Sequence, residues 1–350
     1  MLTILQLIGI LVIGYLGAHF IVGRLQRRFL FSSGVEYIFL GLLAGPQVTG
    51  VMTAEVVSQL TPVMSLAIGA IGLLYGLHLR GWNLTRIEGE FYRITLVEVL
   101  TTSALVGGAA FLVFWHLMGV TEDWIAVVSA ALVLAATAAV SAPNMIENLV
   151  RRHEAGGRLS RLLEFVTNFN QVLGITLFGL VFCLLRVGET RGIQVTRTEW
   201  AAINIGLGVL LGILFFLFLG REKSEQKLTL ALIGIVIFAG GSAYYLNVSP
   251  LFVCLILGMV LGLTSDVKDR LLKILHHFEG PLYVVVLIFA GAAWQPSAHF
   301  PAALLAGLAG GYVFLRYLGK LFGGYLAHRY SLVPDAIPAR AGLGFISQGA

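Results

Sequence analysis

The sequence predicts an all-α polytopic membrane protein, and three observations support this fold class. Of the 350 residues, 58% are hydrophobic and only 12% are charged, whereas a soluble domain carries about 25% charged residues. The apolar residues form successive runs close to the roughly 20 residues that a helix needs to cross a bilayer. The basic residues gather in alternate connections between these runs. The bilayer is therefore the expected solvent for most of the chain.

Twelve segments fit a membrane-crossing helix, and polar or helix-breaking residues interrupt some of them. No basic residue precedes the first segment and no small-residue cleavage site follows it, so we interpret it as a retained span. No connection is long enough to hold a soluble domain, and residues 1–350 are expected to form a single membrane domain. The segments cover residues 2–23, 35–51, 57–79, 94–118, 124–149, 160–185, 200–220, 228–246, 249–264, 280–296, 300–327 and 338–350. The charged stretch 266–278 is expected to be a separate interfacial helix.

The basic residues predict the orientation of these segments. With the N-terminus outside, the odd-numbered connections face the cytoplasm, and they hold 18 of the 23 Lys and Arg residues. This asymmetry is the positive-inside pattern of membrane proteins. It accounts for the excess of 23 basic over 18 acidic residues without a nucleic-acid partner. The 18 are Arg24, Arg27, Arg28, Arg80, Arg86, Arg93, Arg151, Arg152, Arg158, Arg161, Arg221, Lys223, Lys227, Lys268, Arg270, Lys273, Arg329 and Arg340.

A weak internal repeat relates the two halves of the chain. Segment two contains Gly41-x-x-x-Gly45 and segment nine contains Gly258-x-x-x-Gly262. Segments three and ten carry glycine within an apolar run, and segments five and twelve are each interrupted by polar residues. An offset of seven spans is odd, so the two copies would have opposite orientations, as in the inverted repeats of secondary transporters.

The repeat divides the chain into three parts. Residues 1–185 form the first repeat with six spans, 200–220 form a linking span, and 228–350 form the second repeat. A complete second repeat requires a thirteenth span, so we expect the sequence to stop inside the twelfth.

The stretch from Ala135 to Gly174 is the predicted ion site. Segment five (AATAAVSAPNMIENL) carries Thr137, Ser141 and Pro143 inside an apolar run. Proline removes a backbone donor and disfavours helix at its predecessor, so the helix is expected to break between Thr137 and Pro143, at Ala142. Freed backbone carbonyls beside hydroxyls can replace the water around a small ion.

Segment six supplies further polar side chains. Asn170 and Gln171 interrupt it, and Glu164, Asn168 and Gln171 follow at i, i+4 and i+7 on one helical face. That face could present a carboxylate and two amides to the same cavity.

Ionisable residues inside membrane spans are costly and are functional candidates. Lys320 is the deepest cation, and it either reaches the ion site or extends to the interface. Arg316 is four residues earlier, and the structural alternative for it is a tie to loop or helix-end carbonyls. Glu98 and Glu164 are either functional or ion-pair partners of these cations. The sequence contains no HExxH, GxSxG, phosphate loop or Cys/His cluster, so we predict a transporter without a cofactor and not an enzyme.

Four motifs resemble the monovalent cation:proton antiporter superfamily, the sodium/proton and potassium/proton exchangers. EYIFLGLLAGPQ (36–47) resembles a second span of the type GYLLAGILLGP. LAATAAVSAPNMIENL resembles the unwound helix with a TATS or SSTA core, which places its threonine at Thr137. RYLGKLFGG resembles the span with the buried lysine, at Lys320, and LGFISQGA resembles the second crossing helix, with its break near Ser347 and Gln348.

The resemblance implies a fold with two crossed, broken helices and a homodimer in a bacterial plasma (inner) membrane. It implies exchange of a monovalent cation, Na⁺ or K⁺, for protons. The implied ion and proton site comprises Thr137, Ser141, Glu164, Asn170, Gln171 and Lys320, supported by Pro143, Asn168, Arg316, Ser347 and Gln348.

One departure from the family pattern keeps alternatives open. The family places an acidic pair, Asn-Asp or Gln-Asp before VLGL, whereas FNQVLGI places Asn170 and Gln171 there. If the chain is an antiporter, another titrating group must couple the two ions, and Glu164, or alternatively Lys320, is our choice. The first alternative is a degenerate family member that acts as an uncoupled ion pathway, a sensor or a partner subunit. A symporter of organic anions, suggested by Arg316 and Lys320, is the second.

Overall fold

A computed structural model describes residues 34–78, 89–118, 124–185, 196–219, 224–265, 267–295, 301–331, 338 and 341–346. Within these ranges the regular structure is entirely helical. The helices are α2 (Val35–Ala44), α3 (Ala54–His78), α4 (Gly89–Met118), α5 (Trp124–Ala139), α6 (Pro143–Arg152), α7 (Arg158–Leu185), α8 (Arg197–Leu219), α9 (Glu225–Tyr245), α10 (Pro250–Thr264), α11 (Lys268–Ala293), α12 (Ala302–Arg329) and α13 (Gly342–Phe345).

The helices follow most of the expected segments closely. Among the described residues, six helices are long and apolar enough to cross a membrane, and α2, α5 and α10 are shorter apolar helices. The expected first span, 2–23, lies outside the described residues. The separate interfacial helix at 266–278 is wrong, because α11 continues through Pro281 to Ala293. A proline removes only one hydrogen bond, and packing of the flanking turns keeps this helix continuous.

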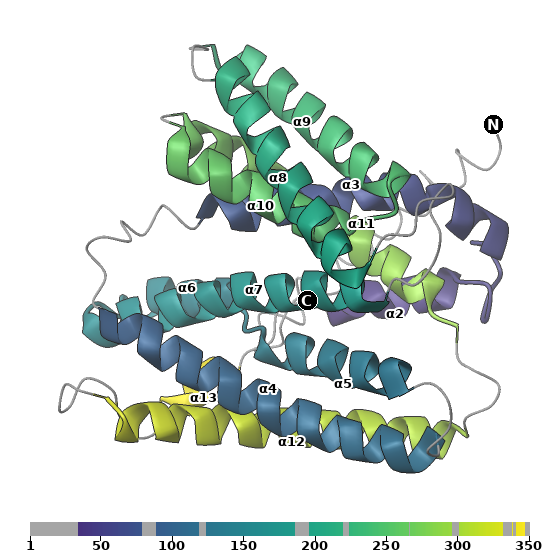
Figure 1. Cartoon of the computed structure of the whole chain (residues 1–350), viewed down its shortest axis with the longest axis vertical. Coiled ribbons are helices and arrows are strands. Elements are labelled where there is room, and N and C mark those ends of the chain that lie inside the picture. The colour runs from purple at the N-terminus through teal and green to yellow at the C-terminus, as the bar shows by residue number, and fades with distance from the viewer. Residues whose placement is uncertain are drawn as a thin grey trace.

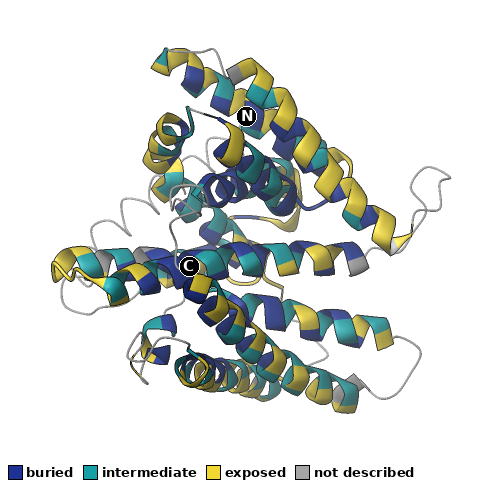
Figure 2. Ribbon diagram, turned by 60° about the vertical axis from the view of Figure 1, so that its left-hand side comes forward, coloured by how far each residue is buried: buried dark blue, intermediate teal, exposed yellow. Residues whose placement is uncertain are grey.

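The described helices form two groups that are separated in Figure 1. One group contains α2, α3, α8, α9, α10 and α11, and we call it the scaffold group. The other contains α4, α5, α6, α12 and α13, and we call it the core group. Figure 2 shows the buried residues concentrated where helices face one another, with exposed residues along the outer faces. Large apolar side chains on those outer faces, such as Phe218 (73% exposed) and Leu230 (72% exposed), suit contact with lipid.

Helix α7 connects the two groups. Near its start, Leu162, Phe165 and Val166 pack with α4 and α13 of the core group. Further along, Val172 and Ile175 pack with α3 and α10 of the scaffold group. Asn170 and Gln171 lie between these two apolar contacts, so the polar pair of segment six sits at the junction of the groups.

Two helix pairs in the scaffold group approach so closely that glycine is required. Helix α2 packs on α11, and α3 packs on α10. A Cβ at Gly41 would collide with the Ile288 carbonyl, and one at Gly258 would lie 2.5 Å from the Leu73 carbonyl oxygen. Small residues in such seams let helix backbones pack directly in a membrane. The scaffold group is therefore held together by backbone contact as well as by apolar side chains.

We expect Gly258→Ala to destabilise the folded protein. Its new methyl group would meet backbone atoms of α3, which cannot rotate away. This overpacking should lower the free energy of unfolding by about 1–3 kcal/mol. Thermal unfolding in detergent would measure this as a lower apparent Tm. Gly206→Ala in α8 is the control, because nothing lies within 4 Å of its added Cβ. An equal Tm for the two variants would contradict the backbone seam.

Candidate ion-binding site

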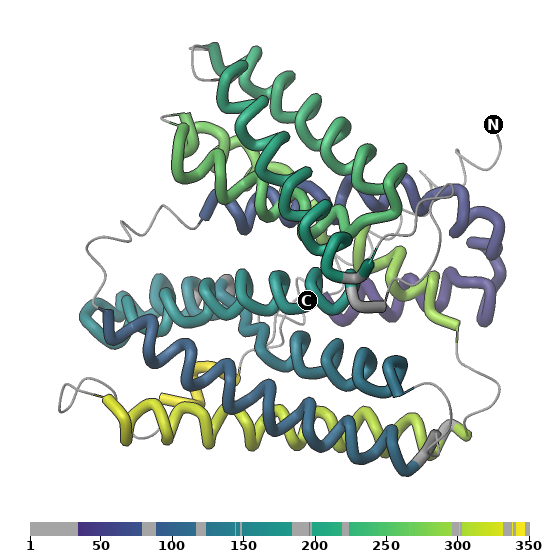
Figure 3. Tube along the Cα trace, in the orientation of Figure 1, coloured from purple at the N-terminus to yellow at the C-terminus, as the bar shows by residue number. Residues whose placement is uncertain are grey.

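The chain unwinds between α5 and α6, inside the predicted interval. Helix α5 ends at Ala139 and α6 begins at Pro143, with Ala142 extended at φ −87° and ψ 102°. Figure 3 follows the chain through this step. In a continuous helix the N–H of residue 143 would bond to the carbonyl of residue 139. Proline has no N–H, so the Ala139 carbonyl requires another donor.

A second short element meets this break. The Ser141 hydroxyl donates to the Phe345 carbonyl at 3.1 Å, where α13 ends. The side chain of Leu163 in α7 lies against Gly344. The expected break at Ser347 and Gln348 lies outside the described residues. The part of segment twelve that the structure describes thus ends directly beside the α5–α6 break.

One face of α12 supplies donors to the α5–α6 break. Tyr312, Arg316 and Lys320 are spaced by four residues and therefore share a helical face. The Tyr312 hydroxyl donates to Thr137 Oγ1 at 3.2 Å. The Arg316 guanidinium donates to the Val140 carbonyl at 2.7 Å and to the Ile346 carbonyl at 2.9 Å. The structural alternative for Arg316, a tie to helix-end carbonyls, is the arrangement observed.

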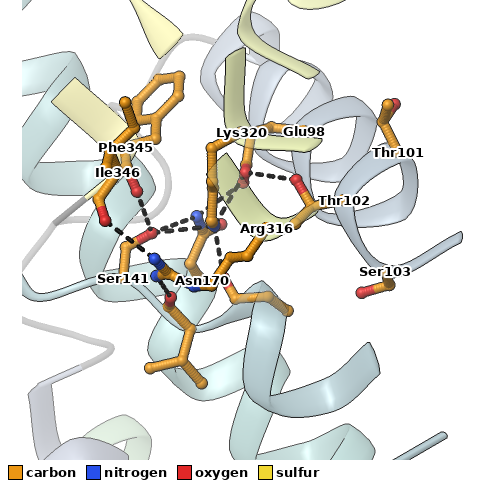
Figure 4. A network of polar contacts seen from close by, with 12 residues as sticks. Glu98, Thr101, Thr102, Ser103, Ser141, Asn170, Arg316, Lys320, Phe345 and Ile346 are labelled. Carbon is orange, nitrogen blue, oxygen red and sulfur yellow. Dashed lines mark hydrogen bonds and ion pairs between the residues drawn. The ribbon is translucent and has the colours of Figure 1, made fainter. Parts of the chain in front are cut away.

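Lys320 lies at the centre of the polar network in Figure 4. Its side chain is fully buried, which excludes extension to the interface. The ammonium contacts Glu98 Oε1 at 2.8 Å, the Ala139 carbonyl at 2.8 Å and Ser141 Oγ at 3.0 Å. Three N–H donors thus meet three oxygens. The lysine supplies the donor that Pro143 cannot supply.

Glu98 is surrounded by donors. Besides Lys320, the Thr102 hydroxyl donates to its Oε1 at 3.0 Å and Asn170 Nδ2 donates to its Oε2 at 2.7 Å. Glu98 and Lys320 both have 0% exposed side chains. Donors alone around a carboxyl group match its ionised form, which only accepts. The site therefore contains a fully desolvated ion pair with no net charge.

Asn170 and Gln171 leave two acceptors unused. Asn170 donates to Glu98 and also to Ser141 Oγ, at 3.2 Å. The amide oxygens Asn170 Oδ1 and Gln171 Oε1 are buried and lack hydrogen-bond partners among the described residues. Neutral amide and carbonyl oxygens are suitable ligands for a small cation. The junction of α5, α7 and α4 thus presents carboxylate, hydroxyl, backbone carbonyl and side-chain amide oxygens.

Glycines allow α12 to bring Lys320 this close. A Cβ at Gly319 would lie 3.2 Å from Thr102 Cα, and one at Gly323 would lie 3.1 Å from Glu98 Cα. Two of the three glycines of the RYLGKLFGG motif, Gly319 and Gly323, therefore face α4 on either side of Lys320. The motif combines a buried cation with the close packing that delivers it to its carboxylate partner.

The structure separates the other predicted residues from this network. Thr137 is connected to α12 through Tyr312. Asn168 donates to the Glu164 carbonyl at 2.9 Å, which is a local contact within α7. The Glu164 carboxylate lies in the electrostatic field of Glu147 and Arg151, whereas the carboxylate that contacts the Lys320 ammonium belongs to Glu98. Of the two acids considered as partners of Lys320, the structure selects Glu98.

Sequence reasoning missed Thr102 and Tyr312 and did not include Glu98 in the site. A signal was present for each of them. Glu98 and Thr102 are four residues apart on one face of a membrane span, and Tyr312 extends the Arg316–Lys320 spacing by one further turn. Polar residues spaced by four inside apolar spans were the available indication.

A broken helix and a buried ion pair within a polytopic helical protein are features of secondary ion transporters. The chain belongs to the sodium/hydrogen exchanger family, because the family model "Sodium/hydrogen exchanger, transmembrane" matches residues 8–350. It is therefore an integral membrane transporter of the exchanger type and not an enzyme. This finding confirms the resemblance of the four motifs.

A solved structure agrees with the fold. The sodium proton antiporter MjNhaP1 from Methanocaldococcus jannaschii, solved at pH 8, matches with a TM-score of 0.66 at 16% sequence identity. The match covers 99% of this chain and 84% of that one. At this identity the likeness concerns the fold alone. No curated protein sequence matches.

We expect Glu98 and Lys320 to be strongly coupled in stability. Removing one partner leaves an unpaired buried charge. Glu98→Gln and Lys320→Met should therefore each lower the free energy of unfolding by about 3–5 kcal/mol. The double variant should lose much less than the sum, because no charge remains unpaired. Thermal unfolding of the four proteins in detergent would measure this. Additive losses would show that the pair does not interact.

Proposed function

We propose that the protein exchanges a monovalent cation for a proton and that the Glu98–Lys320 pair couples the two ions. The observation that carries this proposal is the position of the Lys320 ammonium among three oxygens, one of them a carboxylate oxygen. An ammonium in an all-oxygen site occupies a place that a monovalent cation could take. The carboxylate missing from segment six is thus available from α4.

Competition at this place would supply the coupling. Protonated Lys320 fills the site and excludes the cation. When Lys320 releases its proton and withdraws, Glu98, the Ala139 carbonyl and Ser141 remain as oxygen ligands. Asn170 and Gln171, with unused amide oxygens beside them, would complete the coordination. Binding of the cation and of the proton then exclude each other, which is the requirement for exchange.

The charge balance of the site predicts an electroneutral exchange. Glu98 contributes one negative charge, and either the Lys320 ammonium or a bound monovalent cation neutralises it. The two loaded forms therefore carry the same charge into the low-dielectric interior. One proton would be exchanged for one cation, and both Na⁺ and K⁺ are candidates because the ligands are oxygens of mixed type.

The glycine seams support the inverted repeat as part of this proposal. Gly41 faces the Ile288 carbonyl and Gly45 faces Ala292, whereas Gly258 faces the Leu73 carbonyl and Gly262 faces Leu77. The contacts between α10 and α3 thus repeat those between α2 and α11. Residue numbers differ by 217 between α2 and α10, and by 215 between α3 and α11.

The reciprocal contacts follow the same shifts. A Cβ at Gly291 would collide with the Ile38 carbonyl, and one at Gly76 would collide with the Leu255 carbonyl. This agreement favours two repeats of opposite orientation, at 1–185 and 228–350, with 200–220 between them.

The wider assembly follows from the same proposal. The core group would move past the scaffold group, with α7 at the junction, to expose the site to each side in turn. We place the N-terminus outside a bacterial plasma membrane and propose that the scaffold forms a homodimer. Labelling of a cysteine introduced at Asn247 from the outer side would test the orientation, and the mass of the detergent-solubilised protein would test the dimer.

Transport by purified protein in vesicles tests the coupling pair. Glu98→Gln should abolish cation-driven proton movement, because no carboxylate then holds the cation. Lys320→Arg should abolish it too, since arginine keeps its charge but does not release a proton at physiological pH. Wild-type exchange should be insensitive to an imposed membrane potential. A pH-sensitive dye inside the vesicles reports each result.

Glu164→Gln is the matched control for this experiment. It removes a carboxylate from the neighbouring face of α7 and should leave exchange close to the wild-type rate. If Glu164→Gln abolishes exchange while Glu98→Gln retains it, Glu164 is the coupling acid.

Gln171→Asp tests whether an acidic residue at the position that the family pattern uses can take part in exchange. A carboxylate beside the unused oxygen of Asn170 should strengthen cation binding and lower the KM for the cation about tenfold, as a charged ligand replaces a neutral one. It should also shift the pH dependence of exchange. If wild-type protein moves no protons with cations while Gln171→Asp does, the uncoupled alternative is correct.

A further inference from the structure

Arg316 is the second buried cation of α12, and ion exchange as described above does not use it. Its side chain is only 5% exposed. One guanidinium nitrogen donates to the Val140 carbonyl at 2.7 Å, and another donates to the Ile346 carbonyl at 2.9 Å. A single side chain thus connects the α5–α6 break to the chain segment that follows α13.

Both carbonyls would otherwise be potential cation ligands. Val140 lies in the unwound step after α5, and Ile346 follows the last residue of α13, so neither carbonyl is part of a described helix. A backbone carbonyl without a donor is costly at membrane depth. Carbonyls in this situation coordinate ions in channels and transporters. Val140 is also the direct neighbour of Ala139 and Ser141, both of which contact the Lys320 ammonium.

Arginine and lysine differ in a way that fits their two positions. A guanidinium remains charged under physiological conditions and presents several N–H groups in a fixed fork. Arg316 can therefore hold two carbonyls permanently and at a fixed separation. Lysine is a point charge that can release a proton, and Lys320 is the cation beside the only carboxylate of the network in Figure 4.

We infer that Arg316 is a positioning residue that keeps the Val140 and Ile346 carbonyls away from the transported cation, so that cations bind only where Lys320 competes with them. The inference rests on the proposed exchange. Without this clamp, a cation could bind to the freed carbonyls while Lys320 stays protonated. Cation movement would then no longer require proton release. Arg316 thereby prevents a leak, in addition to holding the α5–α6 break against Ile346.

The test compares Arg316→Met, Arg316→Gln and Arg316→Lys in vesicles with an inside-negative membrane potential and no pH gradient. When the cation concentration is also equal on the two sides, coupled electroneutral exchange allows no net cation uptake, because the membrane potential does not drive it. Arg316→Met should raise net uptake of ²²Na⁺ or ⁸⁶Rb⁺ about tenfold or more, as expected when charge-assisted hydrogen bonds are lost. Arg316→Gln and Arg316→Lys should give net cation uptake between that of wild type and that of Arg316→Met, because each new side chain can hold fewer carbonyls in a fixed geometry. Arg329→Gln, at the exposed end of the same helix, should match wild type.

The outcomes separate the inference from the function on which it rests. If wild-type protein shows coupled exchange and none of the folded Arg316 variants leaks, the positioning role is overturned and the exchange proposal stands. If wild-type protein itself lacks exchange, the proposed function fails first. If Arg316→Met does not fold, the net cation uptake of Arg316→Gln and Arg316→Lys tests the positioning role instead. Lower stability with unchanged coupling in those two variants would show a purely structural role.

Discussion

The requirement that backbone carbonyls find donors inside the membrane governs this structure. Pro143 lacks the donor that the Ala139 carbonyl would use, and the chain is unwound between Ala139 and Pro143. Water is not available to repair the loss in hydrocarbon. Lys320 and Arg316 repair it from a neighbouring helix, because each donates to carbonyls of the α5–α6 break. The position of the break therefore determines where α12 must place its cations.

The buried cations in turn determine the packing of the core group. A desolvated ammonium requires a close carboxylate with good geometry, or its desolvation cost is not recovered. Gly319 and Gly323 let α12 approach α4 until Lys320 reaches Glu98 at 2.8 Å. Thr102 then donates to the same carboxylate oxygen, and Asn170 donates to the other one. Close backbone packing and electrostatics thus depend on each other at this site.

Much of this arrangement could be predicted from local sequence, and the pairing of distant residues could not. Pro143 identified the break, because the loss of an N–H is a property of one residue. The depth of Lys320 in its span made it a candidate for the ion site but left open that it extends to the interface. Its partner could not be identified, since Glu98 and Glu164 both lie within spans and only the packing of α4 on α12 distinguishes them. The charge of the stretch 266–278 misled the prediction, because the continuity of α11 through Pro281 depends on packing.

The location of the carboxylate has a consequence for how exchange can evolve. Exchange requires one negative charge, one group that can release a proton and a place where that group and the cation compete. Here the negative charge is on α4, whereas the family pattern places it on the helix of Asn170 and Gln171. Asn170 donates to Glu98 at 2.7 Å, so the two positions border the same small volume. A carboxylate on either helix can face the same ammonium. Under the proposed exchange, the place of competition can therefore stay the same while a different helix carries the acid.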